Sequence, residues 1–119
     1  MLPKENRLTS RYEFNKVKYL SEKSNSRFNG KFFNLIFAKP TMYEGASKFG
    51  IVVSKKHVNS AVLRNTLKRK YREILRSKLL DINLGYWVVI YPKSRSMEVS
   101  YEELNSSLTQ VLQTNNITK

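Results

Sequence analysis

The chain has 119 residues and a formal net charge of +13 at pH 7, which predicts an acidic partner: nucleic acid first, an anionic membrane second. Its length fits one domain, here residues 1–119, and an apolar content of 40% with seven Tyr and six Phe argues against a disordered basic tail. It has no cysteine, no signal-peptide pattern and no apolar run near the ~18 residues of a membrane span, so we expect a cytoplasmic protein.

The first half of the chain predicts a helix followed by two strands. Ser10 and Glu13 have the spacing of a capping box, so a short helix should begin there and turn three apolar residues toward the core: Phe14, Val17 and Leu20. The polar residues 21–30 predict a loop. Residues 31–39 and 49–54 are rich in aromatic and β-branched side chains, and we expect these two strands to pair as a hairpin.

The second half predicts a helix, a strand and a helix. A polar turn leads into a long helix from Ala61 to about Leu80. Residues 86–91 are almost continuously apolar, which is typical of a strand buried on both faces, and Pro92 should end it. Ser100 opens a final amphipathic helix, and residues 113–119 predict a frayed tail. The order α-β-β-α-β-α predicts an α+β fold, a single-domain sandwich of helices packed on a mixed sheet.

The helix that begins at Ala61 separates into two faces when it is drawn at about 100° per residue. One face is apolar and carries Leu63, Leu67, Tyr71 and Ile74. Another carries an amide and a dense row of cations: Arg64, Asn65, Lys68, Arg69, Arg72 and Arg76. From Lys55 to Lys78 there are nine Lys or Arg and one acid, whereas solvated helices usually mix charge signs. Because guanidinium groups match phosphate oxygens, this helix predicts contact with nucleic acid.

Side chains suited to catalysis are scarce. The chain has one histidine, His57, and one aspartate, Asp81. Its eight Glu are scattered, and the one adjacent pair, Glu102 and Glu103, would point about 100° apart on a helix. Metal-dependent nucleases cluster several carboxylates around their ions. We therefore predict neither a catalytic residue nor a metal site on the protein, and His57 is expected to be a surface or turn residue.

The segment from Gly50 to Arg72 resembles a motif of the bacterial ribonuclease P protein family. The family pattern is a strand ending in Lys-Lys, a short turn, Ala-Val, and then Arg-Asn-x-x-Lys-Arg-x-x-Arg. The matching residues are Gly50-Ile-Val-Val-Ser-Lys-Lys56, Ala61-Val-Leu-Arg-Asn-Thr-Leu-Lys-Arg69 and Arg72. The remaining elements agree in order and spacing over nearly the whole chain. There are two departures: Thr66 stands where many members have Arg, and Lys18 where many have a second aromatic residue.

The resemblance implies both a fold and a division of labour. The fold would be like the second domain of a small-subunit ribosomal protein, with a left-handed β-α-β crossover, although general handedness rules predict a right-handed one. The catalyst would be an RNA that uses Mg²⁺ to cleave precursor tRNA and release the 5′ leader. The protein would serve as a subunit of this endoribonuclease, with ribonuclease P RNA and precursor tRNA as its partners and no metal site of its own.

Two binding surfaces follow from the resemblance. The RNA subunit is expected to contact the basic helix and the turn before it, through Lys55, Lys56, Arg64, Asn65, Lys68, Arg69, Arg72 and Arg76. The leader is expected in a cleft between the sheet and the first helix, against Phe14, Lys18, Phe33 and Phe37. Phe33 and Phe37 share one face of their strand, and either face is open as the lining of the cleft.

Two other functions are open at this point. A ribosomal or other structural RNA-binding protein would use the same basic helix without a leader cleft. An autonomous nuclease is disfavoured by the single His and single Asp.

Overall fold

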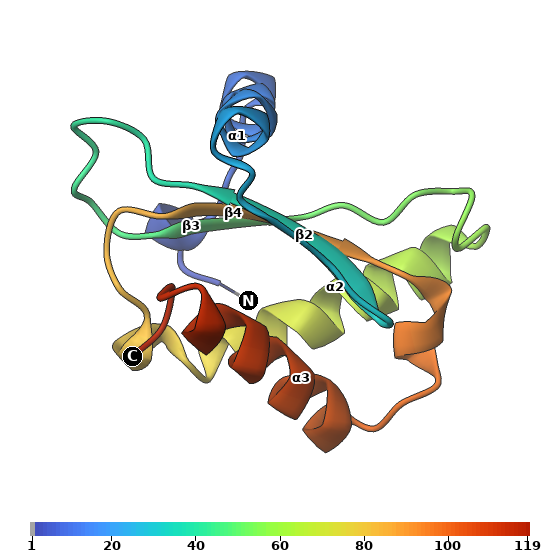
Figure 1. The fold of residues 1–119 in the computed structure, drawn as a ribbon. Helices are drawn as coiled ribbons and strands as arrows, with labels where there is room; N and C mark the ends of the chain where they lie inside the picture. Colours follow the sequence, from blue (N-terminus) through green and yellow to red (C-terminus); the bar gives the residue numbers. More distant parts are fainter. Residues whose placement is uncertain (1) are drawn as a thin grey trace.

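A four-stranded sheet separates one helix on one face from two helices on the other in the computed structural model, which describes residues 2–119 (Figure 1). The lone helix is α1 (Arg11–Ser24), and the pair is α2 (Ala61–Arg76) and α3 (Tyr101–Thr114). The strands are β1 (Arg27–Asn29), β2 (Phe33–Ala38), β3 (Lys48–Ile51) and β4 (Trp87–Pro92). Short 3₁₀ turns complete the chain: η1 (Lys4–Asn6), η2 (Leu79–Asp81) and η3 (Ser94–Met97). No helix within residues 2–119 is both long and apolar enough to cross a membrane.

The predicted order of the main elements is confirmed, but the predicted hairpin is wrong. The spatial order is β1-β2-β4-β3, so β4 lies between the two strands that were expected to pair. It is antiparallel to β2 and parallel to β3, to which it is joined through α2. Val88, Val89 and Ile90 are all fully buried. A strand that is apolar on both faces gains most at the centre of a sheet covered by helices, which explains why β4 displaces the hairpin.

The predicted loop at residues 21–30 contains regular structure. Helix α1 continues to Ser24 and ends at Asn25, whose φ of 55° is the left-handed conformation that Asn tolerates better than most residues. Strand β1 then pairs with β2 at one edge of the sheet. The boundary of the long basic helix also differs, because α2 stops at Arg76 rather than near Leu80, and the chain continues into η2.

Two apolar clusters hold the layers together. The larger lies between the sheet and the α2–α3 layer and includes Leu35, Tyr71, Ile74, Ile90 and Leu104. The smaller lies between the sheet and α1, where Val17 is fully buried and Phe14 and Leu20 are half-buried, as predicted. On α2 the predicted inner face is confirmed except for Leu63, which is 49% exposed in the first turn; Leu75 is buried instead.

The C-terminal tail is packed against the domain, so the prediction of a frayed tail over residues 113–119 is wrong. Ile117 is fully buried in the larger cluster, and Thr118 forms a β-bridge with Ile82. The backbone N–H of Asn83 also donates to the carbonyl of Ile117 at 2.8 Å. One apolar residue within a polar tail was too weak a signal to predict this anchor.

Candidate nucleic-acid interface

A row of polar and basic side chains follows the outer side of α2. Ser60 caps the helix, since its Oγ accepts from the N–H of Leu63 at 3.3 Å. We call the following residues the α2 row: Asn65, Lys68, Arg69, Arg72 and Arg76. At about 100° per residue, all of them except Lys68 fall within an arc of about 60° opposite the buried Leu67, and Lys68 lies beside that arc.

The cations of the α2 row are free to bind an anionic ligand. The one ion pair within residues 2–119 joins Lys48 of β3 to Glu13 of α1, so it involves no residue of α2. Lys70, the remaining basic residue of the helix apart from Arg64, instead donates to the carbonyls of Ser96 and Val99, at 3.2 and 2.8 Å. The helix therefore uses Lys70 for packing and leaves the α2 row without acidic partners.

Arg64 has different surroundings from the α2 row. Its Nη1 donates to the carbonyls of Val58 and Asn59, at 3.0 and 2.9 Å. These carbonyls belong to the turn that carries Lys55 and Lys56, both of which are exposed. Arg64 thus holds the turn in place, a positioning role that the sequence did not reveal, because the helical pattern shows spacing but not hydrogen bonds to a preceding loop.

The groups considered for catalysis lie at the surface. His57 is exposed in the turn before α2, and Asp81 is exposed at the end of η2. Within residues 2–119, no three His, Asp or Glu side chains gather as ligands for a metal ion. The interface consists of guanidinium, ammonium and amide groups, which recognise phosphates.

A hollow of about 230 Å³ borders β3 between α1 and α2. Its lining includes Arg7, Phe14, Gly50 and Arg72. Strand β3 lies at the edge of the sheet, and a Cβ at Gly50 would overlap with the ring of Phe14. Glycine therefore allows the half-buried ring to lie directly against the strand, and the hollow brings this ring together with a cation of the α2 row.

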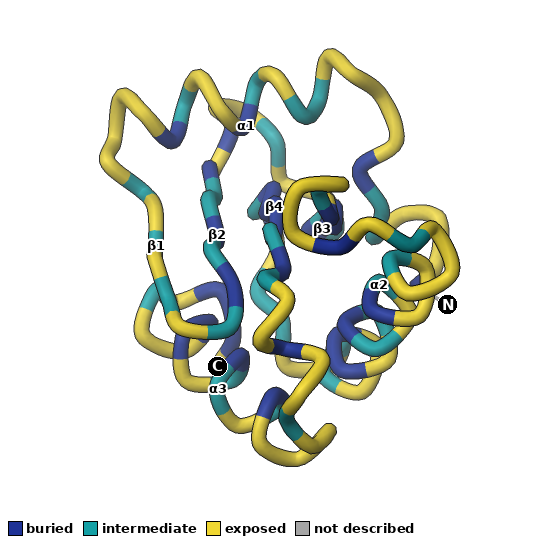
Figure 2. Tube along the Cα trace, turned by 90° about the vertical axis from the view of Figure 1, so that its right-hand side faces the viewer, coloured by how far each residue is buried: buried dark blue, intermediate teal, exposed yellow. Residues whose placement is uncertain are grey.

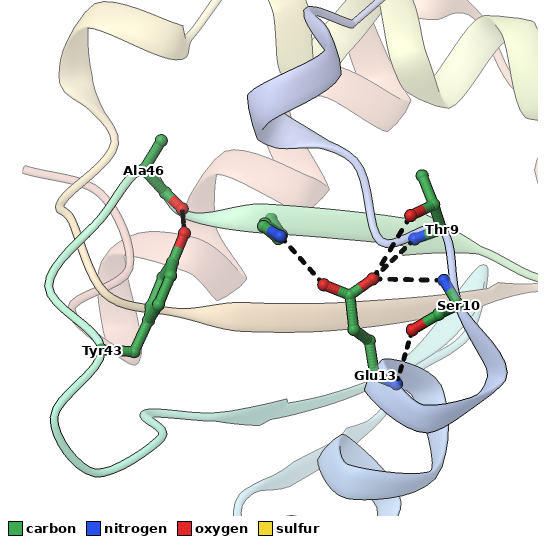
Figure 3. A network of polar contacts seen from close by, with 6 residues as sticks. Thr9, Ser10, Glu13, Tyr43 and Ala46 are labelled. Atoms are coloured by element: carbon green, nitrogen blue, oxygen red, sulfur yellow. Dashed lines mark hydrogen bonds and ion pairs between the residues drawn. The ribbon is translucent and has the colours of Figure 1, made fainter.

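Glu13 fixes the start of α1 beside this hollow (Figure 3). Its Oε1 accepts from the N–H groups of Thr9 and Ser10, at 2.9 and 3.1 Å, and Ser10 Oγ accepts from the N–H of Glu13 at 3.2 Å. Its Oε2 accepts from Lys48 Nζ at 2.9 Å. The predicted capping box is thus confirmed and extended to β3.

The same hydrogen bonds determine the protonation state of Glu13. Burial by itself favours the neutral acid, but the hydrogen bonds from Lys48, Thr9 and Ser10 and the charge of Lys48 outweigh it. Together they lower the pKa of Glu13 to about 2. The carboxylate therefore stays ionised at neutral pH and ties α1 to the edge strand, one residue away from Phe14.

A second hollow, of about 260 Å³, opens between α1 and the β1 edge of the sheet. Its lining includes Lys18, Arg27, Asn34, Ile36 and Tyr91. Lys18 is thus placed beside a cleft between α1 and the sheet, where the sequence analysis expected it. The sequence did not identify the other residues of this lining, although strand alternation would have identified Asn34 and Ile36 once the orientation of β2 was known.

Phe33 lies on the opposite face of β2, so its predicted place in the cleft is wrong, whereas Phe37 lines a hollow of about 370 Å³ together with Leu20 of α1. Phe33 is 1% exposed, and its ring meets that of Tyr71 edge-on at 6.0 Å between centroids. Phe37 packs against the larger cluster, 6.4 Å from the ring of Tyr86. Both faces of β2 carry large apolar residues, and for this reason the pattern alone did not distinguish them.

Comparisons with known proteins bear on this arrangement. The family model described as Ribonuclease P matches residues 2–116. The chain is 36% identical to a ribonuclease P protein component from Microcystis aeruginosa, over 98% of this chain and 95% of the relative. It is 35% identical to one from Pseudanabaena, over 94% and 92%.

Solved structures show the same fold. The RNase P protein from Thermotoga maritima superposes with a TM-score of 0.74 at 30% identity and covers 91% of this chain and 96% of that one. The RNase P protein from Staphylococcus aureus superposes with a TM-score of 0.78, covering 98% and 100%; at 22% identity this likeness concerns the fold alone.

Proposed function

The chain belongs to the ribonuclease P protein family, and from this premise we propose that it is the protein subunit of a holoenzyme that removes the 5′ leader of precursor tRNA. RNA binding and a part in tRNA 5′ processing follow from the family. The observation that supports a leader site is the hollow along β3, where Phe14 and Arg72 line one space. An aromatic face beside a guanidinium group suits a single-stranded nucleotide, because the ring stacks on the base and the cation pairs with a phosphate.

The α2 row is proposed to bind the catalytic RNA subunit, together with Lys55 and Lys56. A-form RNA is recognised mainly through its shape, its phosphates and its 2′-hydroxyl groups rather than its sequence. Guanidinium forks suit phosphates, and the Asn65 amide can both donate to and accept from a 2′-hydroxyl. Arg64 supports this surface by holding the turn on which the two lysines lie.

We further propose that the chemistry belongs to the RNA. Mg²⁺ would be held by RNA phosphates and would stabilise the charge that develops on the scissile phosphate. The protein's described residues provide cations and aromatic rings but no cluster of carboxylates, which supports this division. The protein's own contribution is to bind and orient the leader and to neutralise phosphate repulsion. We place the assembly in the cytoplasm.

The leader site can be tested with two aromatic residues on opposite faces of the sheet. Phe14→Ala should weaken binding of precursor tRNA to the reconstituted holoenzyme by about 1–3 kcal/mol, the usual worth of one stacked base. Mature tRNA, which has no leader, should bind with unchanged affinity. Phe33→Ala is the matched core control, because Phe33 is 1% exposed on the opposite face, and any loss of affinity should be equal for precursor and mature tRNA.

Melting curves of both variants separate a binding defect from a folding defect. If Phe14→Ala weakens precursor and mature tRNA equally, or only lowers the melting temperature, Phe14 is a core residue and the leader site has been misplaced.

A further inference from the structure

We infer that the outer side of α1 is a second platform for single-stranded RNA, which holds leader nucleotides farther from the cleavage site than those in the cleft. The inference rests on the proposed function and concerns a surface outside the two hollows. Tyr12, Lys16, Tyr19 and Lys23 fall within an arc of about 60° when α1 is drawn at 100° per residue. We call these four residues the α1 row.

The two tyrosines of the α1 row are open to solvent. Tyr12 is 67% exposed and Tyr19 is 58% exposed, and the outer side of α1 is largely exposed in Figure 2. Of the other tyrosines, Tyr71 is fully buried, and Tyr101, at 40%, lies on the far side of the molecule in α3. Because the two rings of the α1 row remain largely in solvent, their faces are available to a ligand.

A lysine accompanies each exposed ring. Lys16 Nζ lies 5.6 Å from the centroid of Tyr12, and Lys23 Nζ lies 4.9 Å from the centroid of Tyr19. A cation over one face of a ring leaves the opposite face for a base. Lys16 Nζ also donates to Tyr12 Oη at 3.4 Å, and its remaining N–H groups, like those of Lys23, can donate to a phosphate. The α1 row therefore repeats the pairing of ring and cation that single-stranded nucleic acid requires.

The charge and spacing of the α1 row fit a polyanion. None of its members is acidic. Helix α1 has two acids: Glu13 points inward and is paired with Lys48, and Glu22 is exposed and lines the second hollow beside the row. Seven residues of α-helix separate the two tyrosines by about 10.5 Å. This is about three stacking steps of 3.4 Å along a nucleic-acid strand, so two bases could stack in sequence between the rings.

The position of the α1 row favours the leader over the RNA subunit. Helix α1 lies alone on its face of the sheet, whereas the α2 row lies on the other side (Figure 1). Tyr19 directly follows Lys18, which lines the second hollow, so a strand leaving that hollow meets the α1 row next.

The test uses the reconstituted holoenzyme and two precursor tRNAs, with leaders of about four and about twelve nucleotides, a range that single-strand sites commonly span. A variant with both Tyr12→Ala and Tyr19→Ala should lose roughly fivefold or more of its affinity per ring for the long leader and none for the short one. Tyr101→Ala is the matched control, an exposed tyrosine outside the α1 row, and should bind both precursors normally.

A second variant keeps the rings and removes the charges. With Lys16→Gln and Lys23→Gln, the slope of log affinity against log salt concentration should fall by about 0.7 for each phosphate that the protein no longer neutralises, again only for the long leader. Equal losses for both leaders, or no loss for either, would overturn the inference. Failure of the proposed function looks different, because the wild-type holoenzyme itself would then not prefer precursor over mature tRNA.

Discussion

Arg64 and Arg69 have the same side chain but differ in what surrounds them. Arg69 belongs to the α2 row and is exposed, whereas two backbone carbonyls already occupy Nη1 of Arg64. The sequence predicted one role for both, because helical periodicity assigns a residue to a face without showing hydrogen bonds to a neighbouring turn. The same limitation applies to Lys70, which faces the loop around Ser96 rather than solvent.

Salt dependence should separate the two arginines. Arg69→Ala should weaken binding to ribonuclease P RNA and lower the log–log salt slope by somewhat under one unit, the effect of leaving one phosphate without its cation. Arg64→Ala should lower the salt slope further, because the turn that carries Lys55 and Lys56 loosens as well. Combined with Ala at both lysines, Arg64→Ala should add little, whereas Arg69→Ala should remain additive. An unchanged slope in both single variants would mean that this face is merely solvated.

Glu13 should make stability depend on pH in acid. Its pKa is about 2 in the folded protein and near 4.5 in the unfolded chain, so the stabilisation is fully present above pH 4.5 and is lost as the pH falls toward 2. Glu13→Gln should therefore lower the free energy of unfolding at pH 7 by on the order of 1–3 kcal/mol, discounted for partial screening, and by much less near pH 2. Urea titrations of both proteins at the two pH values measure this. A deficit that is the same at both would show that the ionised carboxylate is not the cause.

At the scale of elements, the sequence predicted those whose pattern is decided locally. The capping residues of α1, the apolar run of β4 and the two-faced α2 each follow from short-range periodicity, and all three were predicted. The pairing of the strands was not predicted, because β2 and β3 are far from β4 in the sequence and their own residues do not specify a partner. Predicting which residues line the cleft requires the same information. Until pairing with β4 fixes which face of β2 points toward α1, Phe33 and Ile36 are equally good candidates for the lining.

The C-terminal tail offers a test of packing that the sequence did not predict. Ile117 is fully buried against the larger cluster, beyond the last residue of α3. Ile117→Ala should cost about 2–5 kcal/mol of stability, the usual range for emptying a buried site of this size. Ser106→Ala, on the exposed side of α3, should change stability by less than about 0.5 kcal/mol. Equal melting temperatures for the two variants would show that the tail is frayed after all.

At the scale of the whole molecule, the fold distributes its net charge of +13 over surfaces for which we propose different ligands. The α2 row and the turn before it form one surface, and the two hollows beside α1 form another. Arg72 belongs to both, since it is a member of the α2 row and lines the hollow that contains Phe14. An RNA subunit on α2 and a leader beside α1 would therefore meet at this residue.

The division of labour between protein and RNA predicts tolerance at the protein's own acid–base groups. His57→Ala and Asp81→Asn should each leave single-turnover cleavage by the holoenzyme within about tenfold of wild type, because both residues are exposed and have no assigned chemical role. Loss of a general acid or base typically costs about 10²–10⁴-fold. A loss of that size with intact folding and RNA binding would place chemistry on the protein.

The most direct test is cleavage of precursor tRNA in Mg²⁺ by the protein alone, by ribonuclease P RNA alone and by the two together. We expect that the protein alone cleaves nothing, and that adding it to the RNA strengthens precursor binding and increases release of the intact 5′ leader. Cleavage by the protein alone, or an RNA reaction that the protein leaves unchanged at any salt concentration, would contradict this expectation.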